Sequence, residues 1–293
     1  MNPETTEFKL HESYWTRLEQ LQVLDADDLH TLSVAVNWPH RPHDIEALIQ
    51  VGQGVIARDA ISRPLGAGMS FQYGPDTAMI GMMITHPKLQ AGGLGREILA
   101  KIERGLVDRR LRLNATRSAW RLYQSVGFRE TGTVVQYQGL TTPIAAPIDG
   151  AKFRLAELED VPTIMALDRQ VFGANRADTL SRLLDVSTVH VISHSLIVTG
   201  FAMCRPFGQG HLIGPLVAGS EADAITLVSS FAADHTGQFL RLDADARHKD
   251  LGSFLNKIGL EDYDKIIAMV KGDAFGPENA SDHVYALSSQ ALG

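Results

Sequence analysis

The sequence is poor in cysteine, has no excess of basic residues and contains no long apolar run. One of its 293 residues is a cysteine, Cys204, so no intrachain disulfide can form and no metal site is expected. Lys and Arg number 27 against 34 Asp and Glu, which gives a formal net charge of −7. Neither nucleic acid nor an anionic membrane is therefore an expected partner. No apolar run approaches the ~18 residues that cross a bilayer, and the first ten residues do not resemble a secretory signal, which predicts a cytoplasmic protein.

The length of the chain and one proline-containing segment predict two domains. A chain of 293 residues exceeds the usual size of one domain, and 44% hydrophobic residues are enough to form buried cores. Residues 141–150 have the sequence TTPIAAPIDG, in which prolines, small residues and a final glycine are typical of a linker. We therefore expect one domain in residues 1–142 and another in residues 151–293.

Predicted strands and helices alternate along the first half. Apolar residues at helical spacing predict helices near residues 27–36, 44–51, 95–106 and 119–126. Segments rich in apolar residues and bounded by turn residues predict strands at 17–24, 54–59, 64–73, 78–85, 111–115 and 131–138. This order predicts an α/β (α+β) domain with one mixed β-sheet flanked by helices.

A glycine-rich turn follows the predicted strand 78–85. Pro87 cannot continue a strand ladder, and Gly92, Gly93 and Gly95 allow positive φ, so successive backbone N–H groups can converge on an anion. The helix that begins here adds unpaired N–H groups and the positive end of its dipole. These features predict a diphosphate site. The spacing excludes a dinucleotide fingerprint, because Ile98 stands where Gly or Ala is needed, and the chain has no Gly-Lys-Ser/Thr triplet of a Walker loop.

Two motifs resemble those of the GNAT (Gcn5-related N-acetyltransferase) family. Gln90, Gly93 and Gly95 match the Q-x-x-G-x-G pattern of the loop with which that family binds the pyrophosphate of acetyl-CoA. Residues 113–128, LNATRSAWRLYQSVGF, resemble the family's fifth strand and the helix that ends in L-Y-x-x-x-G-F. The two motifs occur in the family's order and spacing, and the resemblance covers residues from about 15 to 140.

The resemblance implies an acetyl-CoA site in the first half. Met83 and Ile84 would pair with the pantetheine arm, and Asn114 would lie near the cofactor unless it only forms a turn. Tyr123 would donate a proton to the departing CoA thiolate, although a core aromatic is the alternative for this residue. The backbone of the loop would hold the pyrophosphate through Leu89, Gln90, Ala91, Gly92, Gly93, Leu94, Gly95 and Arg96.

No residue can be assigned as the base that deprotonates the acceptor. Many GNAT proteins have a Glu on the strand that corresponds to residues 78–85, and this segment has no carboxylate. We expect Trp38, His40 and Asp44, which lie between the two early helices, to contribute to the acceptor site. The alternatives are a helix N-cap for Asp44 and a surface loop for His40.

The second half repeats the pattern of the first without its chemistry. Residues 254–260, FLNKIGL, resemble a degenerate L-Y-x-x-x-G-F motif in which Leu255 replaces the tyrosine. Glu221 and Asp223 stand in the predicted first turn of the helix that would bind pyrophosphate, and they would repel it. We expect a degenerate GNAT-like domain that forms a wall of the acceptor pocket, a homodimer interface, or both.

Taken together, the motifs predict an N-acetyltransferase that transfers the acetyl group of acetyl-CoA to a primary amine of a small molecule. Direct attack in a ternary complex would remove much of the entropic cost of association. A non-catalytic acyl-CoA sensor and a protein acetyltransferase acting on lysine or N-terminal amines are the alternatives.

Overall fold

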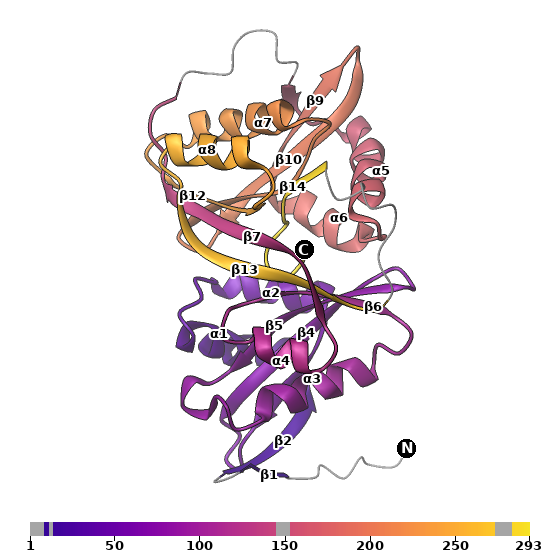
Figure 1. Cartoon of the computed structure of the whole chain (residues 1–293), viewed down its shortest axis with the longest axis vertical. Coiled ribbons are helices and arrows are strands. Elements are labelled where there is room, and N and C mark those ends of the chain that lie inside the picture. The colour runs from indigo at the N-terminus through magenta and orange to yellow at the C-terminus, as the bar shows by residue number, and fades with distance from the viewer. Residues whose placement is uncertain (1–8, 12–13, 145–152, 273–282) are drawn as a thin grey trace. The chain divides into compact units, whose positions relative to one another are not determined.

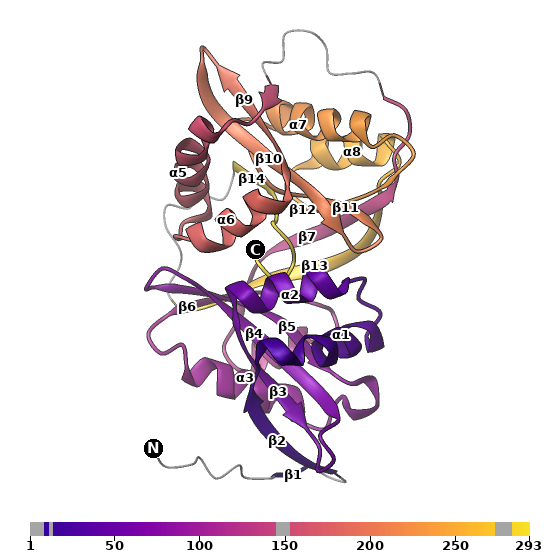
Figure 2. The same cartoon turned by 180° about the vertical axis from the view of Figure 1, so that it is seen from behind.

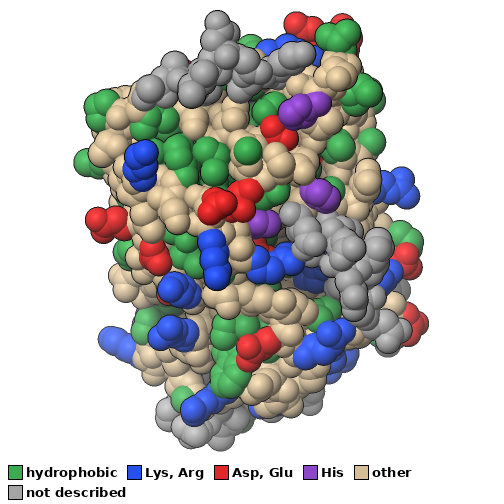
Figure 3. Space-filling view, turned by 45° about the horizontal axis from the view of Figure 1, so that its top comes forward, with side chains coloured by type: hydrophobic (Ala, Val, Ile, Leu, Met, Phe, Trp, Pro, Cys, Tyr) green, Lys and Arg blue, Asp and Glu red, His purple; other side chains and the backbone are tan. Residues whose placement is uncertain are grey.

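The computed structural model describes residues 9–11, 14–144, 153–272 and 283–293 (Figure 1). The chain divides into two compact units, one of Met1–Gln72 and Ala78–Arg109 and the other of Tyr73–Thr77 and Arg110–Gly293. This division does not fall at the predicted linker, because the strands that precede the linker belong to the second unit. No helix among the described residues is long and apolar enough to cross a membrane. On the face drawn in Figure 3, acidic and basic side chains lie interspersed.

The first unit is an antiparallel sheet with helices on both faces. Its strands lie in the order β1-β2-β3-β4-β5, and α3 covers one face while α1 and α2 cover the other (Figures 1 and 2). The strands are β1 (Lys9–His11), β2 (Tyr14–Gln20), β3 (Gln53–Arg58), β4 (Pro64–Tyr73) and β5 (Thr77–Thr85). The helices are α1 (Ala26–Ala35), α2 (Pro42–Val51) and α3 (Leu94–Arg104), with 3₁₀ turns η1 (Val23–Asp25) and η2 (Pro87–Leu89).

Two glycines in β4 let α3 lie directly on the sheet. A Cβ at Gly68 would meet the Ile102 side chain at 2.8 Å, and a Cβ at Gly66 would meet Ile98 at 3.1 Å. Both isoleucines are buried on the apolar face of α3, as their helical spacing predicts. This close packing fixes the position of the α3 N-terminus against the end of β5.

The second unit is a larger mixed sheet. Its strands lie in the order β6-β13-β7-β12-β14-β11-β10-β9-β8, and β11 and β12 are parallel. The strands are β6 (Arg110–Ala115), β7 (Arg129–Leu140), β8 (Phe153–Leu155), β9 (Thr188–His194), β10 (Ile197–Phe207), β11 (Gly210–Val217), β12 (Phe239–Asp245), β13 (Glu261–Lys271) and β14 (Val284–Ala286). The helices are α4 (Trp120–Ser125), α5 (Val161–Phe172), α6 (Ala177–Val186), α7 (Glu221–Asp234) and α8 (Lys249–Lys257), with the 3₁₀ turn η3 (Leu158–Asp160).

Strand exchange joins the two halves of the sequence within this sheet. Strand β13, from the second half, lies between β6 and β7 of the first, and Ile267 pairs with Ala115 on one side and with Thr133 on the other. Strand β7 in turn pairs with β12. The motif that runs from β6 through α4 to β7 is therefore held by strands from both halves.

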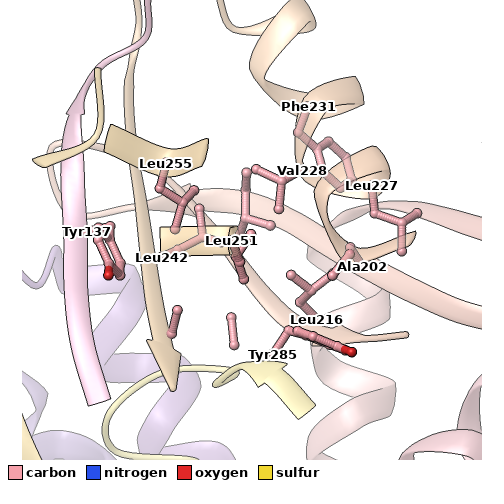
Figure 4. Packing of buried hydrophobic residues seen from close by; sticks show 14 of the residues in the cluster. Tyr137, Ala202, Leu216, Leu227, Val228, Phe231, Leu242, Leu251, Leu255 and Tyr285 are labelled. Carbon is pink, nitrogen blue, oxygen red and sulfur yellow. The ribbon is translucent and has the colours of Figure 1, made fainter. Parts of the chain in front are cut away.

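The core of the second unit lies between its sheet and the helices α7 and α8 (Figure 4). Leu227, Val228 and Phe231 of α7 and Leu255 of α8 are fully buried there. Alternate residues of β10 point to opposite faces, so Ala202 joins this core while the equally buried Phe201 points away from it. Figure 2 shows α5 and α6 covering that other face.

The predicted linker is only partly within the described residues, because 145–150 lie outside them. Its first two residues are held by hydrogen bonds to the second unit. Thr141 is buried and its hydroxyl donates to the His235 carbonyl, while the Thr142 N–H donates to the Ile258 carbonyl at 2.9 Å. Residues 141 and 142 thus extend the fold of the second unit beyond β7.

Candidate active site

The end of β5 departs from regular strand geometry. Met82 has φ of +52°, which is rare for a large side chain and interrupts the pleat. The N–H of His86 donates to the Leu65 carbonyl at 2.9 Å, so His86 faces β4. The backbone N–H and C=O groups of successive strand residues alternate in direction. Those of Ile84 therefore also point toward β4, and those of Met83 point away from it. Of the two residues predicted to pair with pantetheine, only Met83 directs its backbone groups to the side opposite β4.

The loop after β5 is tied back to the strand by side-chain hydrogen bonds. The Gln90 side-chain amide donates to the Thr85 carbonyl at 3.3 Å, and His86 Nδ1 accepts the Lys88 N–H at 3.4 Å. The Leu89 N–H donates to the His86 carbonyl at 2.8 Å, which closes the 3₁₀ turn η2. Gln90 therefore shapes the loop through its side chain.

Two residues of the loop adopt the left-handed conformation that forms an anion-binding nest. Ala91 has φ of +69° and Gly93 has φ of +87°, whereas Gly92 and Gly95 do not have positive φ. A Cβ built on Gly93 would meet no atom within 4 Å. The space above Gly93 is thus open, and the glycine is required there by its backbone conformation.

The N-terminus of α3 supplies further donors. The first hydrogen bond of the helix is donated by the Glu97 N–H to the Gly93 carbonyl at 3.2 Å. The amides of Leu94 and Gly95 precede it and have no acceptor within the helix. Residues 86–96 contain no carboxylate, and Lys88 and Arg96 at its edge are exposed cations. These donors and this charge fit a pyrophosphate.

Asn114 and Tyr123 lie in the second unit. The Asn114 side-chain amide donates to the Gln290 carbonyl at 2.9 Å. Tyr123 is buried, its ring packs edge-on against Phe128 at 5.8 Å between centroids, and burial raises the pKa of its phenol. The hydroxyl is protonated at neutral pH, as a proton donor must be, and its raised pKa makes it a weaker acid than a free phenol.

The three residues predicted for the acceptor site have local structural contacts. The Asp44 carboxylate is largely buried and accepts from the Arg41 guanidinium at 2.7 and 3.1 Å and from the Arg41 N–H at 2.8 Å. Asp44 is thus in the first turn of α2 and not at its N-cap. His40 Nδ1 hydrogen-bonds the Ser33 hydroxyl at 2.7 Å, and its ring lies 5.9 Å from Trp38. These contacts join the end of α1 to the start of α2.

The corresponding turn of the second half is filled by its own side chains. Ser220 caps α7 by accepting the Asp223 N–H at 3.2 Å. The Asp223 carboxylate contacts His194 Nε2 at 3.0 Å. Glu221 reaches across to α8 and accepts the Leu251 N–H at 2.8 Å. A serine hydroxyl therefore caps α7, and a carboxylate from the first turn of α7 binds the N-terminus of α8.

Comparisons with known proteins identify the family of the chain. Two family models, each described as "Acetyltransferase (GNAT) domain", match residues 46–142 and 164–286. The Bacillus subtilis (strain 168) protein named "Uncharacterized N-acetyltransferase YitH" is 27% identical over 263 residues, which cover 87% of this chain and 91% of that protein.

Solved structures share the fold over nearly the whole chain. A crystal structure from Pyrococcus horikoshii has a TM-score of 0.77 at 19% identity and covers 97% of this chain and 99% of its own. A tandem GNAT protein from the clavulanic acid biosynthesis pathway has a TM-score of 0.63 at 14% identity, and the match covers 88% of this chain and 99% of that one. The two family matches together span well over half of the sequence. The chain therefore belongs to the GNAT N-acetyltransferases, a family of acyltransferases that use acyl-CoA as donor, and it contains two GNAT domains in tandem.

Proposed function

We propose that the first GNAT domain binds acetyl-CoA through residues 89–96 and transfers its acetyl group to a primary amine of a small molecule. The observation that carries the proposal is the pair of left-handed residues, Ala91 and Gly93, placed directly before the N-terminus of α3. Their amides and those of Leu94 and Gly95 are suited to the pyrophosphate. The first turn of α3 carries one acidic residue, Glu97, against two, Glu221 and Asp223, in the first turn of α7.

The proposed reaction forms a carbon–nitrogen bond and breaks the carbon–sulfur bond. Bound acetyl-CoA supplies the acetyl group as a thioester. Met83, whose backbone faces away from β4, would orient the pantetheine arm, and Tyr123 would give its proton to the sulfur as the bond to carbon breaks. The acceptor attacks as the neutral amine, and its nitrogen releases one proton to solvent as the amide forms. Tyr123 regains from solvent the proton that it gave to the sulfur, so the products are the amide and CoA thiol. Trp38, His40 and Asp44 remain the predicted acceptor residues, and their contacts support a structural role as well.

We further propose that the second GNAT domain has lost cofactor binding. Glu221 and Asp223 occupy the helix N-terminus that would hold pyrophosphate, and Leu255, buried in the core, stands at the position of Tyr123. Strand β14 also lies between β11 and β12, where it pairs with both. A role for this domain in the acceptor pocket or in a homodimer remains a prediction.

A panel of polyamines, aminoglycosides, amino acids and peptides, assayed for thiol release from acetyl-CoA, tests the function. Turnover with a small amine that is lost in Gly93→Val supports the proposal. Turnover confined to peptides would favour a protein acetyltransferase. Tight binding of acetyl-CoA with no product from any amine would favour an acyl-CoA sensor.

A further inference from the structure

The segment 283–293 is built into the second unit as an internal strand. Strands β11 and β12 pair directly at His211–Leu240 and Leu212–Arg241, and further along β14 lies between them. Ala286 of β14 pairs with Leu216 on one side and with Ala244 on the other. The Leu287 N–H continues this pairing with a bond to the Asp243 carbonyl at 2.9 Å. The segment therefore enters the sheet with both of its edges bonded.

Beyond β14 the segment is held by buried side chains. The Ser288 carbonyl accepts from the Arg205 guanidinium, and the Ser288 hydroxyl accepts from Arg176 at 2.9 Å. Arg176 is itself fixed by a bidentate pair with Asp168 at 2.7 and 2.9 Å. The Tyr73 hydroxyl donates to the Leu292 carbonyl at 2.8 Å. These contacts on both sides of Gln290 restrict where residues 289–291 can lie.

Gln290 connects this segment to the first half of the sequence. Its backbone carbonyl accepts from the Asn114 side-chain amide at 2.9 Å. Its own side-chain amide donates to Gln136 Oε1 at 3.0 Å and to Asp243 Oδ1 at 3.2 Å. Strand β6, which carries Asn114, is thereby linked through Gln290 to β7 and β12. With its amide nitrogen bonded to Gln290, Asn114 has a fixed orientation and its amide oxygen faces away from that bond.

We propose that Gln290 is a positioning residue for the acyl-CoA site and that it acts through Asn114. The inference rests on the proposed function, in which Asn114 lies near the cofactor. A bound pantetheine arm carries amide N–H groups, and an asparagine oxygen held in one orientation is a suitable acceptor for one of them. Because the oxygen is oriented before the ligand arrives, binding does not have to restrict this side chain.

The experiment compares Gln290→Met, Asn114→Ala and the double variant in the full chain. Gln290→Met keeps the length of the side chain and removes its donors, and Gln290→Asn is the second variant should Gln290→Met not fold. Acetyl-CoA affinity is measured by calorimetry, so no acceptor is needed, and thermal unfolding is measured in parallel. Ser230→Ala is the control, because its buried hydroxyl bonds His190 and the Leu227 carbonyl instead of the segment 283–293.

We expect Gln290→Met and Asn114→Ala each to weaken acetyl-CoA binding by about 3- to 10-fold, the value of one hydrogen bond. The double variant should bind no more weakly than Asn114→Ala, because Gln290 acts through Asn114. Ser230→Ala should lower the unfolding temperature without changing the affinity. Wild-type affinity in Gln290→Met, or effects of the two substitutions that multiply, would overturn the inference. Failure of the wild-type chain itself to bind acetyl-CoA would instead overturn the proposed function.

Discussion

Substitution of Gly93 and Gly95 by alanine separates the stability of the loop from its role in binding. Gly93 has φ of +87°, so an alanine there would be forced into the left-handed region at a cost of about 1 kcal/mol. Gly95 lies in the first turn of α3 without positive φ, so an alanine there should stabilise the helix by about 0.5 kcal/mol. For a unit of this size these changes correspond to shifts in unfolding temperature of about −4 to −5 °C and about +2 °C.

Both substitutions should nevertheless weaken CoA binding. In each case a methyl group is added to the surface on which we propose that the pyrophosphate lies, and one charge-assisted hydrogen bond would be lengthened or lost. Such a bond contributes about 1.5–3 kcal/mol, which corresponds to a loss of affinity of roughly 10- to 150-fold. If the two substitutions shift the unfolding temperature in opposite directions but both weaken CoA binding, local unfolding does not explain the loss of affinity.

The assay uses calorimetry with CoA and thermal unfolding without ligand. Gly105→Ala is the matched control, because Gly105 lies at the C-terminal end of the same helix, and a Cβ there would make its closest contact, 3.4 Å, with the Ile102 carbonyl. It should leave CoA affinity unchanged. If Gly95→Ala stabilises the protein and binds CoA as the wild type does, the loop does not hold the phosphates and the proposed site is wrong.

Three further outcomes are expected. Tyr123→Phe should lower kcat by roughly 100-fold at saturating acetyl-CoA, with the affinity unchanged because the ring still packs on Phe128. Since burial raises the pKa of Tyr123, the wild-type rate should not fall through loss of this proton until the pH exceeds about 10. Wild-type turnover in this variant would leave Tyr123 as a core residue. Calorimetry should give one CoA per chain, and two would show that the second domain binds as well. Asp168→Ala should lower the free energy of unfolding, measured in urea, by about 3–5 kcal/mol, because it leaves the buried Arg176 without its carboxylate; a loss below about 1 kcal/mol would contradict this reasoning.

The features that the sequence predicted best are local in the chain. The end of β5, the turn and the start of α3 follow one another within a few residues, so Pro87 and the glycines were sufficient to predict them. The identity of the left-handed residues was less accessible. Three glycines suggested three such positions, and the structure uses Gly93 and Ala91, because glycine permits positive φ without requiring it. The salt bridge between Asp44 and Arg41 was also not predicted, because a carboxylate three residues after an arginine has many alternative partners.

The elements that the sequence did not predict depend on contacts between distant segments. Helix α6, whose buried apolar residues include Leu180 and Leu183, was not predicted. Strand β13 begins with five exposed and mostly charged residues, 261–265, which give no strand signal. It becomes a strand because β6 and β7 bond to its two edges. Strand β14 has three residues and is likewise defined by its two neighbours.

The same dependence on distant segments applies to the residues that we propose for the cofactor site. The loop 89–96 is formed entirely by the first unit, but Asn114 and Tyr123 are carried by β6 and α4, which lie in the second unit. Asn114 pairs with Ala268 of β13, and its side-chain amide donates to the Gln290 carbonyl, so these two partners of Asn114 come from the second half of the sequence. We therefore expect the second half of the sequence to be needed to hold β6, the strand on which the second motif begins. The proposed loss of cofactor binding in that half is compatible with retention of its fold, because β13, which belongs to that half, pairs with both β6 and β7.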